Sequence, residues 1–132
     1  MKPNQPAYSG EWYQTACAEL AKVAALKDGW NGSRTKSPRE EAKKLADVLG
    51  RLDISLSLQP SIVPFSRGDG VEAEWCYNGR IVEIGIEAGV GLFALFSVEG
   101  GTPPVELIPE GIEEPTPEQL AVVSRYINQL MS

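Results

Sequence analysis

The chain of 132 residues contains no histidine. This absence excludes catalysis by serine–histidine and cysteine–histidine pairs, and it excludes metal sites that are built on imidazole ligands. Paired carboxylates such as Glu74 and Glu83 remain as candidates for acid–base chemistry. Neighbouring glutamates on an open sheet face lack a cleft that would raise one pKa. We therefore expect no enzyme activity. A small hydrolase that uses paired glutamates is kept as the third hypothesis, after the two binding hypotheses given at the end of this subsection.

Cysteine is scarce, and long apolar runs are missing. Cys17 and Cys76 stand in no Cys-x-x-Cys motif, so we expect two reduced, buried thiols. No run approaches the roughly 20 apolar residues of a membrane span, and the first residues lack the apolar segment of a signal peptide. We expect a cytoplasmic protein that does not contact membranes. The length fits a single domain, residues 1–132, in which residues 1–10 form a flexible tail.

Basic residues are scarce in the second half of the chain. Residues 61–132 hold three Lys and Arg against eleven Asp and Glu, a net charge of −8, whereas residues 1–60 have a net charge of +2. Binding to nucleic acid requires clustered Lys and Arg, so no direct contact with nucleic acid is expected. An acidic half suits a basic protein surface, for example that of a nucleic-acid-binding protein or complex.

Cofactor and metal motifs are also missing. The stretch from Gly89 to Ala94 imitates a dinucleotide fingerprint, but it opens a strand where the fingerprint requires a helix. Asp28 and Asn31 do not have the spacing of a calcium-binding loop. We expect neither a cofactor nor a metal ion.

What the sequence does contain is a β-meander over residues 71–98. Apolar and acidic residues alternate up to Tyr77, and Asn78-Gly79 then predicts a two-residue type I′ turn. This turn pairs Trp75 with Val82 on an apolar face. It also pairs Glu74 with Glu83 on the opposite, acidic face, where like charges are mildly destabilising.

A second turn lies between Gly89 and Gly91. A three-residue loop over residues 88–90 brings four apolar residues to the core face: Leu92, Ala94, Phe96 and Val98. A two-residue loop would exchange the faces, because a slip of one residue reverses every side chain. With the three-residue loop, Phe93 and Leu95 lie on the acidic face. Either a loop or helix of the same chain covers them, or they form a partner site.

Helices are predicted on both sides of the meander. Apolar residues recur at helical spacing over residues 11–27. Ser37-Pro38-Arg39-Glu40 has the pattern of a capping box and predicts a second helix that begins with Ser37 as its cap. Thr116-Pro-Glu-Gln119 repeats that pattern and predicts a third helix that runs to about Leu130.

Three further segments have weaker signals. Residues 52–58 fit either a strand or an extended connection. Residues 61–65 form a short edge strand at best because Pro64 cannot donate to a ladder, and residues 105–108 are a possible last edge strand. The predicted fold is α+β, an antiparallel meander of about four strands packed on one face by helices, in the order α-α-β-β-β-β-α.

Short motifs over residues 26–87 resemble those of a diffuse group of small uncharacterised bacterial and phage proteins. The motifs are Gly-Trp-Asn-Gly at residues 29–32, Ser37-Pro38 before a helix, Asp69-Gly70, Glu74-Trp75 and Glu83-Ile84. The shared pattern of the group is Trp-Asp-Gly, a helix, and Asp-Gly before Glu-Trp on a strand. Asn31 replaces the usual Asp. The resemblance implies a chain from a bacterium or its mobile elements, and it implies no particular activity.

The functional hypothesis is an acidic protein-binding module that masks a basic surface of a partner, as an inhibitor such as an antitoxin or anti-defence factor does. The candidate partner-binding residues on the sheet face are Glu72, Glu74, Glu83, Glu87, Phe93 and Leu95. A second candidate patch is an acidic loop with Glu110, Glu113 and Glu114. The alternative is a structural homodimer that is joined through the Phe93 and Leu95 face.

Overall fold

The computed structural model describes residues 11–32, 36–55, 58–65, 70–101 and 103–131. Its elements are α1 (Glu11–Ala24), α2 (Arg39–Leu49), β1 (Ser61–Pro64), β2 (Gly70–Tyr77), β3 (Arg80–Glu87), β4 (Gly91–Val98), β5 (Val105–Ile112) and α3 (Pro117–Asn128). This α+β order confirms the predicted fold class, with five strands rather than four. The predicted tail, residues 1–10, lies outside the described residues.

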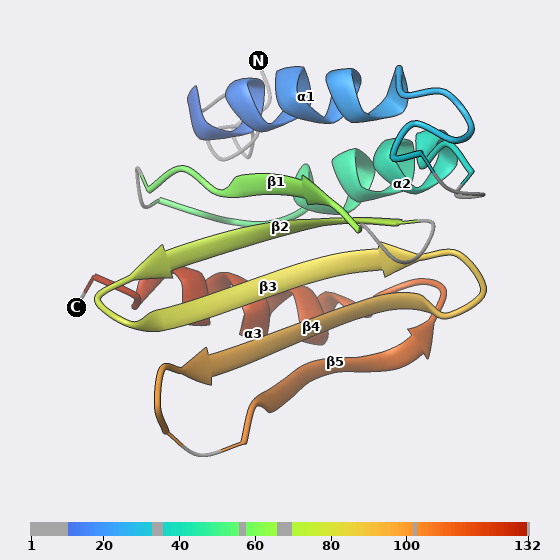
Figure 1. Cartoon of the computed structure of the whole chain (residues 1–132). Coiled ribbons are helices and arrows are strands. Elements are labelled where there is room, and N and C mark those ends of the chain that lie inside the picture. The colour runs from blue at the N-terminus through green and yellow to red at the C-terminus, as the bar shows by residue number, and fades with distance from the viewer. Residues whose placement is uncertain (1–10, 33–35, 56–57, 66–69, 102, 132) are drawn as a thin grey trace.

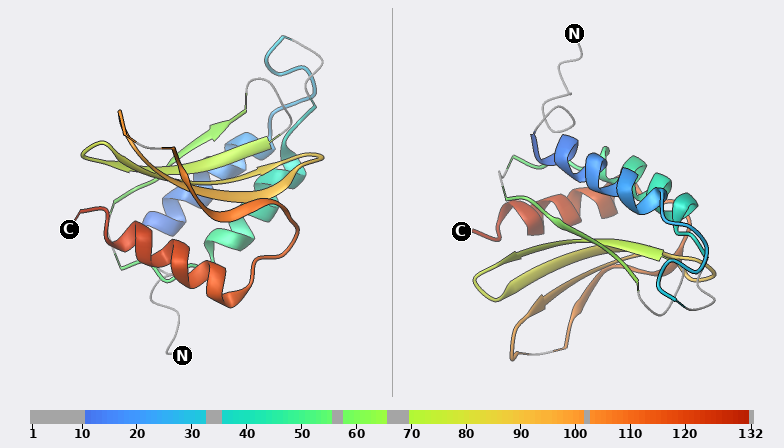
Figure 2. Two further views of the ribbon diagram at one scale, coloured as in Figure 1. Left: turned by 90° about the horizontal axis from the view of Figure 1, so that it is seen from below. Right: turned by 45° about the horizontal axis from the view of Figure 1, so that its top comes forward.

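One antiparallel sheet and one layer of helices make up the fold. The strands follow the order β1-β2-β3-β4-β5, so each strand pairs with its neighbour in the sequence. All three helices lie on the same side of the sheet (Figures 1 and 2). Helix α1 packs on α2 and β1, α2 crosses β2 and β3, and α3 lies against β3 and β5. No helix of the described residues lies on the opposite face of the sheet.

The two central hairpins have the predicted register. Asn78 and Gly79 form the first turn with φ angles of 56° and 79°, the left-handed conformation that a type I′ turn requires. Trp75 therefore pairs with Val82, and Glu74 pairs with Glu83. In the second hairpin Glu87 pairs with Gly91, which leaves the three-residue loop that was predicted.

Both edge segments are strands, and the last one is longer than predicted. Strand β1 pairs with β2 along its four residues. Strand β5 continues past Pro109 to Ile112, and register shifts against β4 accompany it. An edge strand tolerates proline because only one side of it is hydrogen-bonded, and irregular pairing accommodates the missing N–H. The acidic segment predicted as a loop therefore begins as a strand.

The core is centred on Trp75, which is fully buried between the sheet and α1. Its indole packs edge-to-face against Trp12 with ring centroids 5.8 Å apart. Helix α1 supplies the predicted buried stripe: Trp12, Ala16, Leu20 and Val23. The helix ends at Ala24, three residues earlier than expected. Of the four apolar β4 residues assigned to the core face, Val98 is 44% exposed because it lies at the end of the strand.

The two predicted capping boxes have different outcomes. The Thr116 hydroxyl accepts from the Gln119 N–H at 3.1 Å, and the Gln119 side chain accepts from the Thr116 N–H at 2.9 Å, which confirms the cap of α3. The cap at Ser37 is wrong. The cap position of α2 is Pro38, no side chain caps this helix, and the Ser37 hydroxyl is buried without a partner. The helix begins one residue later than the motif suggests, so the hydroxyl lies out of reach of the first helical N–H groups.

The connection over residues 52–58 forms neither a helix nor a strand in its described part. It is attached to α3 instead. The Asp53 N–H donates to the Ser124 hydroxyl at 3.0 Å, and the Asn128 amide donates to the Asp53 carbonyl at 3.0 Å while its oxygen accepts from the Ser55 N–H at 2.9 Å. Side chains of α3 thereby satisfy backbone groups that a neighbouring strand would otherwise pair.

Cys17 and Cys76 are free thiols, but Cys76 is exposed. The prediction that both thiols are buried is therefore wrong, because Cys76 lies on the side of β2 that faces away from the helices. Among the described residues, no helix is long and apolar enough to cross a bilayer.

Candidate functional site

The candidate site is the sheet face that lies opposite the helices, here called the open face (Figure 2). Alternate residues of each strand reach it, because side chains along a strand point to opposite sides. It is the predicted acidic face extended onto the two edge strands. Its side chains come from Ser61, Val63, Phe65, Glu72, Glu74, Cys76, Ile81, Glu83, Glu87, Phe93, Leu95, Ser97 and Glu106.

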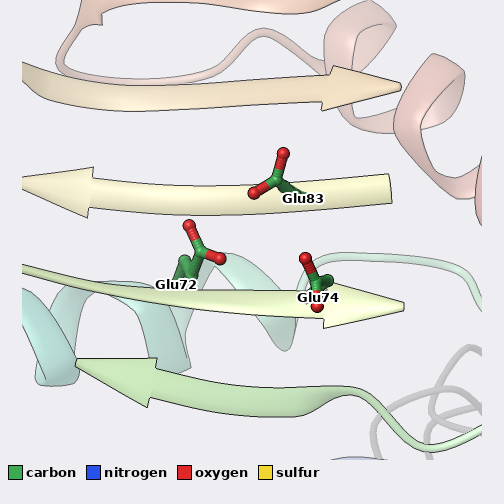
Figure 3. A group of neighbouring side chains, drawn as sticks. All are labelled: Glu72, Glu74 and Glu83. Atoms are coloured by element: carbon green, nitrogen blue, oxygen red, sulfur yellow. The ribbon is translucent and has the colours of Figure 1, made fainter. Parts of the chain in front are cut away.

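Three carboxyl groups converge at the centre of this face. Glu72 and Glu74 are two residues apart on β2, and Glu83 lies opposite Glu74 on β3. One carboxylate oxygen from each of the three residues lies within 4.8 Å of the others (Figure 3). We call these three residues the glutamate cluster. The structure thus brings together three of the residues that were predicted from the hairpin register.

Two phenylalanine rings cover the sheet beside the cluster. Gly85 lies between Glu72 on β2 and Phe93 on β4. A Cβ atom placed on Gly85 would lie 2.4 Å from the Phe93 ring and 3.3 Å from Glu72 Cβ, so ring and glutamate are close neighbours. The Phe65 ring covers Gly70 in the same way and stacks on Phe93 at 6.2 Å between centroids. In the part of the chain that the structure describes, these side chains line the open face and no loop or helix covers them.

The packing changes the electrostatics of Glu72. This side chain is half-buried, and burial is the largest cause that raises its pKa from 4.5 to about 7. The charge of Glu83, a hydrogen bond shared with Glu83 and the charge of Glu74 add to the effect. Burial and like charges both disfavour the ionised form of a carboxyl. The expectation that no pKa would be raised on an open face is therefore wrong for Glu72, because burial and the neighbouring glutamates raise its pKa without a cleft.

A raised pKa alone does not make the cluster a hydrolytic centre. Carboxyl pairs of glycoside hydrolases stand about 5–5.5 Å or 6.5–9.5 Å apart, with the scissile bond between them. The oxygens of the glutamate cluster are within 4.8 Å and leave no such space. Three oxygens are also few for Ca²⁺, which takes about 6–8 ligands, and we assign no metal site here.

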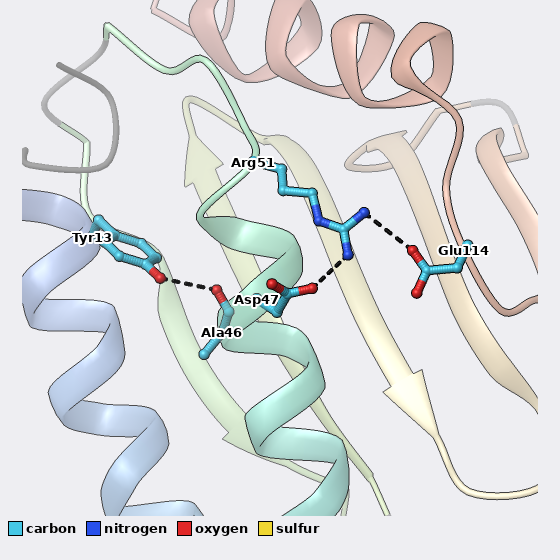
Figure 4. A network of polar contacts seen from close by, with 5 residues as sticks. All are labelled: Tyr13, Ala46, Asp47, Arg51 and Glu114. Atoms are coloured by element: carbon cyan, nitrogen blue, oxygen red, sulfur yellow. Dashed lines mark hydrogen bonds and ion pairs between the residues drawn. The ribbon is translucent and has the colours of Figure 1, made fainter. Parts of the chain in front are cut away.

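The second candidate patch lies at one end of the sheet and is only partly available. Glu114 pairs with Arg51 at 3.1 Å, and the same guanidinium binds Asp47 of α2 at 2.5 Å (Figure 4). The Tyr13 hydroxyl donates to the Ala46 carbonyl at 3.1 Å and holds α1 against the same helix (Figure 4). Glu114 is thus held in an ion pair within the chain, with a guanidinium that it shares with Asp47.

Glu110 and Glu113 remain exposed at the end of β5 and just beyond it. Glu113 borders a groove of about 590 Å³ between α2 and the β3–β4 turn. Its other charged lining residues are Glu40, Glu41, Lys44 and Glu87. Glu87, the last residue of β3, therefore lies between the open face and this groove. Glu110 lies near the end of β5 and does not belong to the glutamate cluster.

Sequence reasoning missed several residues of these surfaces, among them Phe65, Glu106, Glu40 and Glu41. Glu106 pairs with Leu95 and so joins the open face, and this follows once residues 105–108 are taken as a strand. Phe65 follows Pro64 directly, which obscured its place on the face. Glu40 and Glu41 of α2 border the groove, and no motif in the sequence indicated a functional role for them. Comparisons of the chain with protein-family models, with curated proteins and with solved structures gave no match.

Proposed function

We propose that this protein binds a basic surface of another protein through its open face and thereby masks that surface, as an inhibitor does. One observation carries the proposal. Three carboxylates converge beside an aromatic ring, and no Lys or Arg among the described residues reaches the same face. The two described arginines of the acidic half lie elsewhere: Arg80 donates to the Leu130 carbonyl on the helix side, and Arg125 belongs to α3.

Charge and shape support different parts of this proposal. Carboxylates of one sign accelerate encounter with a basic surface, and the rate falls as salt screens them. Affinity then depends on a few apolar side chains that are buried in the complex. Phe93 and Leu95 are half-buried beside the glutamate cluster, and Val63 is 44% exposed at the edge of the face. These residues offer apolar anchors next to the carboxylates.

A homodimer through the same face is less well supported. A two-fold interface brings the same patch of both copies together. Here it would oppose two glutamate clusters with no described basic residue between them, and like charges that are opposed in an interface weaken it. A partner with Lys or Arg at its surface removes this repulsion.

The test compares two charge-reversed variants of equal charge. The open-face variant carries Glu74→Lys and Glu83→Lys, and the control carries Glu110→Lys and Glu113→Lys at the end of the sheet. Glu114 is left intact because of its pair with Arg51. Proteins captured from a lysate of the native host by the wild type are identified, purified and titrated against all three proteins at 50 and 200 mM salt.

The expected partner binds the wild type and the control, loses affinity for the open-face variant and binds more weakly at high salt. Phe93→Ala should weaken the same complex because it removes an apolar anchor, and the remaining complex should still bind more weakly at high salt. Equal affinity for the open-face variant would overturn the proposal. A salt-insensitive complex would overturn its electrostatic part.

A further inference from the structure

We propose that binding of a basic partner to the open face is coupled to the release of one proton from the glutamate cluster. This inference rests on the proposed function and adds a regulation by pH to it. The free protein holds the proton, and a Lys or Arg side chain of the partner replaces it.

The geometry of the cluster favours a retained proton. Three ionised carboxyl groups in so small a space repel one another, so one of them keeps its proton to a higher pH than an isolated carboxyl does. Glu72 is the member that is placed to hold it, because it is half-buried beside Phe93 and shares a hydrogen bond with Glu83. A protonated carboxyl can donate in that bond, whereas two carboxylates cannot.

The surroundings provide no alternative cation among the described residues. From β2 the ionisable neighbours on the open face are Glu74 and Cys76, and from β3 they are Glu83 and Glu87. Strand β5 adds Glu106. The open-face residues of β1 and β4 are not ionisable, and the helices lie on the opposite side of the sheet. Among the described residues, no basic side chain can therefore neutralise the cluster in the free protein, and a bound proton takes that role.

The pKa of Glu72, about 7, agrees with this arrangement. Glu72 is largely neutral at pH 6 and largely ionised at pH 8. A guanidinium binds the ionised cluster better, so the apparent affinity follows the fraction of protein in which Glu72 is ionised. That fraction rises from about one tenth to about nine tenths over these two pH units, and we expect an affinity about tenfold higher at pH 8.

The probe is a peptide of eight arginines with an acetylated N-terminus and an amidated C-terminus. Arginine stays protonated throughout this range, so any titration belongs to the protein. Calorimetry at pH 6 and pH 8, in pairs of buffers with different ionisation enthalpies and with EDTA present, gives both the affinity and the number of protons released. The expected result is close to one proton released at pH 6, close to none at pH 8 and a tenfold change in the dissociation constant.

Two isosteric variants separate the cluster from the rest of the face. Glu72→Gln should release no proton and bind with the same affinity at both pH values. Glu106→Gln removes one charge from the same face without touching the cluster. It should weaken binding by the same factor at both pH values and leave the released proton unchanged.

Failure of the coupling and failure of the proposed function have different signatures. Binding that is lost in the open-face variant but releases no proton at pH 6 overturns the coupling alone. A carbon-13 titration of the free protein in which the Glu72 carboxyl has its midpoint near 4.5 also overturns it. No binding at either pH, or equal binding to the open-face variant, overturns the proposed function and the coupling with it.

Discussion

The ring of Phe93 fills the space that a side chain at Gly85 would need. A Cβ atom at Gly85 would lie 2.4 Å from Phe93 Cζ and 2.6 Å from Cε1, distances that require one of the two residues to move. The glycine thus serves a packing purpose, because the missing side chain leaves room for an aromatic ring from the next strand. Glu72 is the neighbour of Gly85 on β2, and its Cβ would lie 3.3 Å from the same added atom.

Gly85→Ala should therefore destabilise the fold by about 1–3 kcal/mol, the usual cost of overpacking a filled site. Chemical denaturation of the single variants and of the double variant with Phe93→Ala measures the effect. In the Phe93→Ala background the added methyl group meets no ring, so the penalty of Gly85→Ala should largely disappear. A penalty of equal size in both backgrounds would show that the ring is not its cause.

Trp75→Ala should cost about 3–5 kcal/mol, because it removes a large, fully buried side chain and leaves a cavity. The edge-to-face contact with Trp12 is lost as well. The denaturation midpoint gives the change in stability. Tyr77→Ala, on the same face of β2 but 39% exposed, is the control and should change stability far less. Equal losses in both variants would contradict the placement of Trp75 in the core.

The two capping motifs should respond differently to the same change. Thr116→Ala removes the hydroxyl that accepts from the Gln119 N–H and should cost about 1 kcal/mol. Ser37→Ala removes a buried hydroxyl that has no partner, so it should be neutral or slightly stabilising. Thermal melts of both variants test this contrast. A loss of about 1 kcal/mol at Ser37 would show that its hydroxyl caps α2 after all.

The sheet register was predictable because two local rules act together. Period-two alternation assigns residues to faces, and Asn78-Gly79 sets the pairing that places Trp75 against Val82. The end of β5 was not predictable from such rules. Pro109 signals a break within a strand, and only the position of β5 at the edge of the sheet makes the residue tolerable.

The candidate site was predictable in its membership but not in its chemistry. Hairpin pairing alone places Glu74 and Glu83 together with Glu72 on one face. The raised pKa of Glu72 depends on the burial of its side chain and on the approach of the Glu83 carboxyl, which are packing details that no periodicity reveals. The ion pair between Glu114 and Arg51 was not predictable either, because the two residues are 63 positions apart in the chain.

The raised pKa of Glu72 also makes folding stability depend on pH, with a definite sign. Between pH 4.5 and about 7 the unfolded chain loses the Glu72 proton while the folded protein keeps it. Stability from this group therefore falls as pH rises through that window and levels off above it. Glu72→Gln keeps a neutral side chain of the same shape, so it should lose this dependence.

We expect the stability of Glu72→Gln relative to the wild type to rise from pH 4.5 to pH 7 and to stay constant up to pH 9. The full pKa shift corresponds to about 3 kcal/mol. Solvent screening at a half-exposed carboxyl reduces the expected gain to about 1 kcal/mol. Urea denaturation of both proteins at each pH measures the difference, in which the contributions of all carboxyls remote from the cluster cancel. The control Glu106→Gln should show no such rise, and a flat difference for Glu72→Gln would mean that the cluster holds no proton near neutral pH.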